Sequence, residues 1–313
     1  MSWILVALSA YFFLALANLF DKFLVDNVLP GSKAYAFVAC IFGAIVFLAA
    51  PWLLEWPGAY WLVIDLLAGF IFAIALWLLY EALRRGEASQ TLVFVGGSTP
   101  VFSIIFSILF FDEKFSPLEW IGIITLLIGI LIVATLPKHR HFLTRIFSKL
   151  RLTQNIQSNS LIFAFGSALA YSVYFIVTKY AYSSQEFAST FIWTRLGAAF
   201  FVLIFLINKK DRHEILGIFS KQKKRKNKHG FLIIVNQAIG STGFILQNYA
   251  IFLGSVALVN ALQGVQYGFL LIISSLLAIV SPKLLKENFS WRIFLQKLVA
   301  VIVIAFGLYF ILA

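Results

Sequence analysis

Apolar residues occur in ten stretches of about 20 residues each, separated by short polar gaps. A helix of this length crosses roughly 30 Å of hydrocarbon. Backbone groups in lipid must be hydrogen-bonded within their own segment, and the strands of a membrane barrel would alternate over only about 10 residues. The pattern therefore predicts ten transmembrane α-helices. In chain order, the predicted spans 1 to 10 are 3–20, 34–54, 60–82, 88–111, 118–136, 160–182, 188–207, 230–253, 256–280 and 291–312.

The composition excludes a water-soluble globule. Hydrophobic residues make up 61% of the chain and charged residues only 12%, with a mean hydropathy of +0.94. Soluble domains usually contain about 25% charged residues. We therefore expect an all-α integral membrane protein with many spans in the cytoplasmic membrane.

Lysine and arginine residues gather in alternate gaps, and their placement predicts the orientation of the chain. The gaps after spans 1, 3, 5 and 7 hold two, two, five and nine of them, and four lie in or around the gap after span 9, with Arg292 and Lys297 at the start of span 10, which is 22 of the 25 in the chain. Of the other three, only Lys114 lies in an even-numbered gap. Basic residues favour the cytoplasmic side of a membrane. We therefore expect these odd-numbered gaps in the cytoplasm and both termini outside it.

The same basic residues bear on the partners of the protein. A formal net charge of +12 would suggest nucleic acid in a soluble protein. Here the basic runs at 138–151 and 221–229 adjoin membrane spans, so contact with anionic lipid headgroups is the simpler interpretation. Expected partners are a small-molecule solute and membrane lipids at the basic loops. A homodimer is left open, and no nucleic acid is expected.

The two halves of the chain repeat one another. Glu81-Ala82, Gly86 and Pro100 align with Tyr249-Ala250, Gly254 and Gly268 at a constant offset of 168 residues. The predicted organisation is a first repeat at 1–136, a basic inter-repeat loop at 137–159 and a second repeat at 160–313. Because each repeat has five spans, an odd number, the second lies inverted relative to the first. Inverted repeats are an architecture of secondary transporters.

Several segments of the chain resemble a known family. The first half contains Gly86-Glu87-Ala88-Ser89, Pro100 and the run FFDEKFSPLEWIGIITLLIGILIV, and the second half contains TKY, WTRLG and GSVALVNALQGVQYG. In this order they resemble the EamA domain of the drug/metabolite transporter superfamily. The resemblance implies ten helices around a central cavity and movement of small metabolites by alternating access. Members of the family usually keep both termini in the cytoplasm, so the direction of transport is not carried over to this chain.

Polar side chains on shared helical faces are the candidate solute ligands, because polar groups inside a membrane usually face a cavity or a partner. In span 9, Asn260, Gln263 and Tyr267 recur at i, i+3 and i+7. In span 8, Asn236 and Gln247 belong to a similar stripe. Two such stripes predict a hydrogen-bonding pocket between the halves. The alternative is that these amides only hold helices together.

Aromatic and amide residues on other spans extend the predicted pocket. Span 6 presents Tyr171 and Tyr174 on one face. In span 1, Asn18 follows Tyr11 at i+7, on the same helical face. Tyr80, near the end of span 3, completes the set. The alternative for the tyrosines is packing or anchoring at the membrane interface.

Charged residues inside or at the ends of spans are candidates for gating. Glu81 ends span 3 and Lys179 ends span 6, while Arg195 lies about two turns inside span 7, where a charge is costly. Arg195 has three possible roles: binding an anionic group of the solute, snorkelling to outer headgroups, or pairing with Asp65 or Glu186. Pro100 interrupts the hydrogen-bond ladder of span 4 and is interpreted as a hinge, with a rigid packing kink as the alternative.

The chain lacks the motifs of an enzyme or a metal site. Cys40 is the only cysteine, all four histidines lie in the basic loops, and neither HExxH nor GxSxG nor a phosphate-binding loop occurs. We therefore expect no cofactor and no metal. The expected function is a secondary transporter that moves a small polar or amphipathic metabolite, such as an amino acid. The alternatives are a flippase for a lipid or lipid-linked sugar, or a membrane scaffold without transport.

Overall fold

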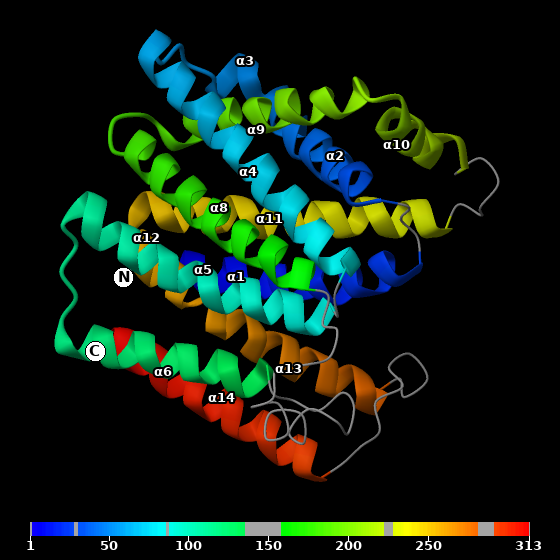
Figure 1. Cartoon of the computed structure of the whole chain (residues 1–313). Helices are drawn as coiled ribbons and strands as arrows, with labels where there is room; N and C mark the ends of the chain where they lie inside the picture. Colours follow the sequence, from blue (N-terminus) through cyan, green and yellow to red (C-terminus); the bar gives the residue numbers. More distant parts are fainter. Residues whose placement is uncertain are drawn as a thin grey trace.

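The computed structural model describes residues 2–27, 31–85, 88–134, 158–221, 228–280 and 291–312, and these residues form helices joined by short connections (Figure 1). Within these ranges there is no strand. The structure therefore confirms the all-helical class. Most of the predicted inter-repeat loop and much of the basic runs lie outside the described residues.

Most helices follow the predicted spans closely. The first half contains α1 (Ser2–Asn27), α2 (Ser32–Gly43), the 3₁₀ helix η1 (Ala44–Ala49), α3 (Ala50–Leu53), α4 (Ala59–Arg85), α5 (Ala88–Phe111) and α6 (Pro117–Ala134). The second half contains α8 (Ser158–Tyr182), α9 (Phe187–Leu203), η2 (Ile204–Leu206), α10 (Lys209–Lys221), α11 (Lys228–Leu253), α12 (Val256–Ala261), α13 (Gln263–Val280) and α14 (Trp291–Leu312).

Five stretches of the described chain are long and apolar enough to cross a membrane by themselves. They are Ser32–Leu53, Ala59–Arg85, Phe94–Phe111, Ser160–Tyr182 and Phe187–Leu206. Shorter apolar helical stretches occupy Ser2–Asn18, Pro117–Ile132 and Leu298–Ile311. Ten spans in two inverted repeats therefore stay a prediction, with five spans supported by length and composition.

Small residues let the central helices approach closely. A Cβ atom at Gly69 of α4 would lie 2.1 Å from the carbonyl oxygen of Thr194, and one at Gly197 of α9 would lie 2.4 Å from the carbonyl oxygen of Leu66. The backbones of α4 and α9 are thus in direct contact at a glycine on each side, a typical way to pack helices in lipid. On its other side α4 packs along α8, which brings the two halves together.

Three parts of the fold differ from the sequence prediction. The predicted continuous span 256–280 is divided at Leu262 into α12 and α13, and the basic segment after span 7, predicted as a loop, contains the helix α10. Span 34–54 also changes character, because its second half is 3₁₀ helix rather than α-helix. These differences matter because the candidate site lies at the first and a charged pocket lies beneath the second.

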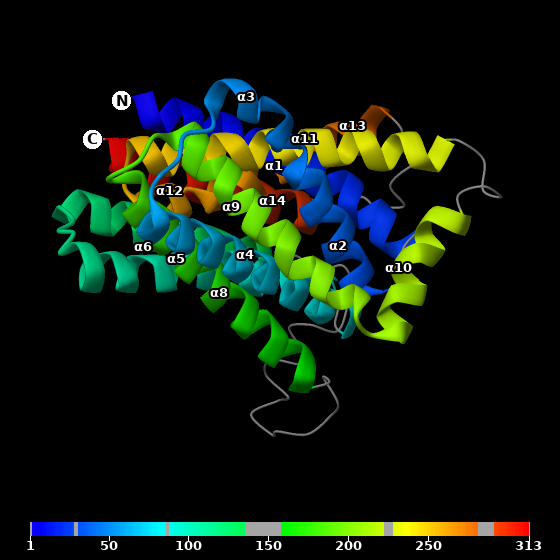
Figure 2. The same cartoon turned by 90° about the horizontal axis from the view of Figure 1, so that it is seen from above.

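The two ends of the bundle carry different elements. Both termini lie at the same end as the connection between α5 and α6, and α10 lies at the opposite end (Figures 1 and 2). This arrangement agrees with termini and even-numbered gaps sharing one side of the membrane. Which side is the cytoplasmic one stays a prediction from the basic residues.

Candidate functional site

The break between α12 and α13 is caused by a side chain from another helix. The hydroxyl of Tyr11 on α1 donates a hydrogen bond of 2.6 Å to the carbonyl oxygen of Val259. In a continuous helix that oxygen would accept from the backbone N–H of Gln263. A group that inserts into the hydrogen-bond ladder interrupts a helix. The start of α12 is fixed separately by Ser255, whose hydroxyl oxygen accepts from the N–H of Leu258 at 3.2 Å.

Buried polar side chains from both halves meet beside this break. The amide of Asn260 donates to the hydroxyl oxygen of Ser103 on α5 at 2.8 Å. The amide of Gln247 on α11 donates to Asn260 Oδ1 and to Tyr11 Oη, each at 3.4 Å. These four side chains, which we call the break cluster, are at most 6% exposed. Two come from the first half and two from the second, so the cluster bridges the halves.

A second polar cluster adjoins the first through neighbouring residues of α11. Tyr174 on α8 donates a hydrogen bond of 2.7 Å to Asn248 Oδ1, and Tyr182 donates to the same oxygen at 3.4 Å. The hydroxyl oxygen of Tyr174 in turn accepts a hydrogen bond of 2.7 Å from Arg195 Nη2. Because Gln247 and Asn248 are adjacent, a displacement of α11 would disturb both clusters at once.

Arg195 lies in an aromatic cage. Its guanidinium carbon is 3.9 Å from the ring centre of Phe72, 4.9 Å from those of Phe191 and Phe244, and 5.5 Å from that of Tyr174. The side chain is 4% exposed, and its Nε has no hydrogen-bond partner among the described residues. Attraction between a cation and aromatic faces is strongest where water is excluded, so the rings offset part of the cost of burying this charge.

The carboxylates predicted as partners of Arg195 do not pair with it. Within the described chain Arg195 forms no ion pair with Asp65 or Glu186, and Asp65 instead accepts a hydrogen bond of 3.3 Å from Gln185 Nε2. Of the three roles considered for Arg195, the ion pair with Asp65 or Glu186 is therefore the one that the structure contradicts. The aromatic cage was not visible in the sequence, because its rings come from three helices besides α9.

Lys179 ties α8 to the end of α11. Its ammonium donates to the carbonyl oxygens of Ile251, Phe252 and Gly254 at 2.9, 3.2 and 2.7 Å. The last carbonyls of a helix lack backbone partners and carry partial negative charge. Lys179 is thus a cap for α11, and this contact fixes the connection that leads into α12.

Tyr267 of α13 contacts α5 about one turn before Pro100 of α5. Pro100 lacks the N–H that would bond to the carbonyl of Gly96, and a Cβ atom at Gly96 would lie 1.9 Å from the hydroxyl oxygen of Tyr267. The side chain of Tyr267, 5% exposed, therefore reaches α5 where its ladder is weakened. The hinge role of Pro100 stays a prediction.

The remaining predicted residues are distributed between the interior and the helix ends. Asn236 is buried on α11, while Asn18 and Gln263 are half-buried on α1 and α13. The side-chain amide of Gln263 makes no hydrogen bond with the described residues. Tyr171 contacts Phe72 edge-on at 6.1 Å between ring centres, close to the cage of Arg195.

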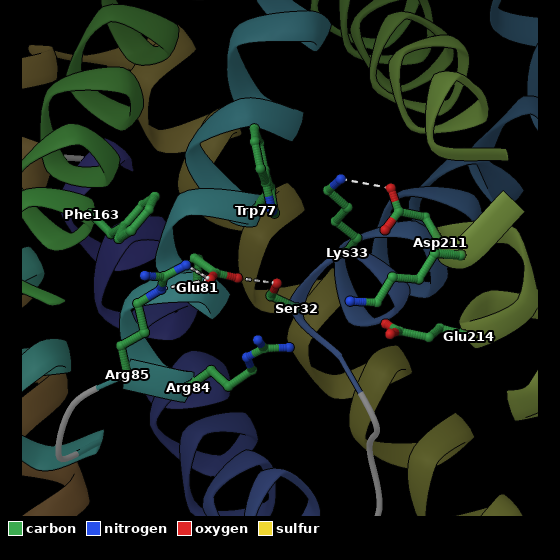
Figure 3. A pocket seen from close by; sticks show the side chains of 10 residues that line it. Ser32, Lys33, Trp77, Glu81, Arg84, Arg85, Phe163, Asp211 and Glu214 are labelled. Carbon is green, nitrogen blue, oxygen red and sulfur yellow. Dashed lines mark hydrogen bonds and ion pairs between the residues drawn. The ribbon is translucent and has the colours of Figure 1, made fainter. Parts of the chain in front are cut away.

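Glu81 and Tyr80 lie together at the other end of the molecule, away from the break cluster. The Glu81 carboxylate accepts a hydrogen bond from Ser32 and pairs with Arg85 at 2.5 Å, while the ring of Tyr80 contacts Tyr35 at 4.2 Å. Glu81 lines a pocket of about 250 Å³ (Figure 3). The other lining residues are Ser32, Lys33, Trp77, Arg84, Arg85, Phe163, Lys210, Asp211 and Glu214.

Some residues of these clusters were not among the predicted ligands. Ser103, Asn248 and Tyr182 are buried and hydrogen-bonded, and Tyr11 contributes more to the polar interior than its predicted neighbour Asn18. A serine in an apolar span does not by itself indicate a binding site, because its hydroxyl can donate a hydrogen bond to a backbone carbonyl of its own helix. No group of three metal-binding side chains occurs within the described ranges.

Comparisons with known proteins show a shared fold over the whole chain and a family match over its first part. A solved crystal structure is similar over 99% of this chain and 96% of its own length, with a TM-score of 0.66 and 15% sequence identity. At that identity the likeness shows a shared fold across both halves and nothing about the solute. No curated protein sequence matches the chain. Residues 1–135 match the model of the EamA-like transporter family. This first part of the chain is therefore similar to the EamA-like transporter family, which is part of the drug/metabolite transporter superfamily.

Proposed function

We propose that this protein is a secondary transporter that moves a small polar or amphipathic metabolite, such as an amino acid, by alternating access. The solute is bound at the break between α12 and α13, in contact with the break cluster and Gln263. The observation that carries the proposal is the interrupted helix itself. Transporters commonly build their sites from interrupted helices, since free backbone groups and polar side chains converge there.

The contacts around the break support a site between the two halves. Tyr11 and Ser103 belong to the first half, and Gln247 and Asn260 to the second. A movement of one half against the other would break the three hydrogen bonds that cross between them, from Tyr11 to Val259, from Gln247 to Tyr11 and from Asn260 to Ser103. A solute with its own donors and acceptors would replace them, which lowers the cost of leaving buried polar groups unpaired.

The amide of Gln263 has a different role from the other polar groups. Asn260 and Gln247 are bonded to protein partners, whereas Gln263 is half-buried beside them without such a bond in the described chain. A half-buried amide with unused donors and an unused acceptor is suited to a transient ligand. We therefore assign solute contact to Gln263 and alignment of the site to Asn260 and Gln247.

The proposal is tested first by a thermal-shift screen of amino acids, sugars and nucleotides on the purified full-length protein. A ligand that binds only the folded state raises its apparent stability. Any solute that does so is then offered, radiolabelled, to proteoliposomes, with a headgroup-labelled lipid as a separate arm. Solute exchange supports the proposal. Movement of lipid alone would support a flippase, and the absence of both activities would support a scaffold.

A further inference from the structure

The structure assigns α10 the role of a lid over the charged pocket at the end of the molecule opposite the termini. The lid is held closed by an ion pair between Lys33 and Asp211. This inference rests on the proposed transport function, because a carrier has to open and close each of its ends. It concerns a helix that the sequence did not predict and residues outside the break cluster.

The ion pair joins α10 to the start of α2. Lys33 Nζ lies 2.6 Å from Asp211 Oδ2, with the two side chains 33% and 14% exposed. The same ammonium lies 5.6 Å from the ring centre of Trp77 on α4 and 5.5 Å from that of Phe205 on η2. The rings shield the pair from water on one side, which strengthens it relative to an ion pair on an open surface.

Two further residues on the same face of α10 complete the contact. A Cβ atom at Gly31 would lie 2.6 Å from Glu214 Oε2, so this carboxylate lies against the chain just before α2 begins. Ile215 is 1% exposed and belongs to the main apolar core. Arg212 and Leu216, between and after them, are exposed. Residues 211, 214 and 215 therefore form one closing edge.

The pocket beneath this edge is lined on one side by α4 and α8, which are held in place by packing, and is covered by α10, which has few buried contacts. Its walls are the ends of α4 and α8, where Arg85 pairs with Glu81 and lies 4.6 Å from the ring centre of Phe163 (Figure 3). Among the described side chains of α10, Ile215 alone is buried. An element with few buried apolar contacts opens more easily than its surroundings.

The chain before α10 provides a place for the lid to turn. The α-helical part of α9 ends at Leu203, and η2 ends at Leu206. The side chain of Asn208 then caps α10 by accepting from the N–H of Lys210 at 2.9 Å. Hinges are commonly a few residues at the ends of elements, so α10 moves as a unit about residues 207–208.

The lid is tested by measuring its position with two spin labels on the full-length protein in nanodiscs. Labels are attached through Arg212→Cys on α10 and Leu161→Cys on α8, both exposed positions, after Cys40→Ala removes the native thiol. Asp211→Asn should increase the fraction of long distances about two- to fivefold, the effect of losing a partly exposed ion pair. Lys209→Gln, an exposed change on the same helix, should leave the distances unchanged.

A charge exchange separates the ion pair from a general effect of mutation. Lys33→Asp combined with Asp211→Lys restores the attraction and should return the distances to those of the parent protein. An unchanged distribution in Asp211→Asn, or a failure of the exchanged pair to reverse its effect, would overturn the lid. Because no solute is needed, this result is independent of the transport assay.

Discussion

At the residue scale, the interior of this protein is organised by hydrogen bonds that cross between helices. Tyr174 is the clearest example, because its hydroxyl donates to Asn248 and accepts from the guanidinium of Arg195. One fully buried phenol thus connects α8, α9 and α11. The cost of leaving such partners unpaired exceeds the energy of the bond itself.

Tyr174→Phe should therefore destabilise the protein with little change in shape. Asn248 and Arg195 each lose a partner while staying buried, so the free energy of unfolding should fall by about 1–3 kcal/mol. The matched control is Tyr309→Phe, since Tyr309 on α14 is 63% exposed, and we expect a change within about 0.5 kcal/mol. Unfolding in detergent measures both, and equal stabilities would show that the Tyr174 bonds contribute nothing.

The sequence predicted these residues unevenly. Tyr174, Gln247 and Asn260 were identified because a polar group in an apolar span is conspicuous. The aromatic partners of Arg195 were not predicted, because a buried arginine looks the same in the sequence whether it pairs with a carboxylate or lies among aromatic rings. Phe72 and Phe244 are typical lipid-facing residues by composition, and only the fold turns them towards a charge.

At the element scale, local sequence patterns located the apolar helices well and failed where another element decides the outcome. The predicted spans 88–111 and 291–312 coincide with α5 and α14. The interruption at Leu262 was missed because its cause is Tyr11, some 250 residues away in the chain. The helix α10 was missed because it is polar, and hydropathy reports only helices that lie in lipid.

Close contact between α4 and α9 is a property of single glycines, and it gives a second prediction. Gly69→Ala places a Cβ atom 2.1 Å from a backbone oxygen, which neither helix can avoid without moving. We expect a loss of about 1–3 kcal/mol in stability, typical of overpacking, or a failure to fold.

Gly217→Ala on α10 is the control, because its Cβ would have no neighbour within 4 Å. It should be neutral or slightly stabilising, since alanine favours helix. Thermal unfolding of both variants tests the contact, and equal melting temperatures would contradict it.

At the scale of the whole molecule, the arrangement of the ends agrees with the distribution of charge. The termini lie at one end, and α10, which begins with Lys209 and Lys210, lies at the other (Figures 1 and 2). From the positive-inside rule we predict that α10 faces the cytoplasm and that both termini lie outside it.

Reporter fusions after Ala313 test this orientation in a bacterium. Green fluorescent protein should stay dark when carried across the membrane by the general secretory route, whereas alkaline phosphatase at the same position should be active. Their activities depend only on the side of the membrane that each occupies. A fluorescent fusion together with an inactive phosphatase would reverse the predicted topology.

We propose that a solute is bound where α12 and α13 separate, between the two halves. The most direct test of this site is the affinity of Gln263→Leu for a solute found in the thermal-shift screen. Losing one hydrogen bond to a buried polar solute costs about 1–3 kcal/mol, so affinity should fall roughly 5- to 150-fold. The melting temperature without solute should stay close to that of the parent protein, because Gln263 has no hydrogen bond to lose within the described chain.

Two variants are measured beside it. Ile124→Leu, on the exposed apolar face of α6, should bind as the parent does, while Asn260→Leu should lose stability as well as affinity, since its amide bonds to Ser103. We expect weak binding by a stable Gln263→Leu protein. Normal affinity in Gln263→Leu would contradict a solute site at the helix break and leave the amides there as contacts between helices.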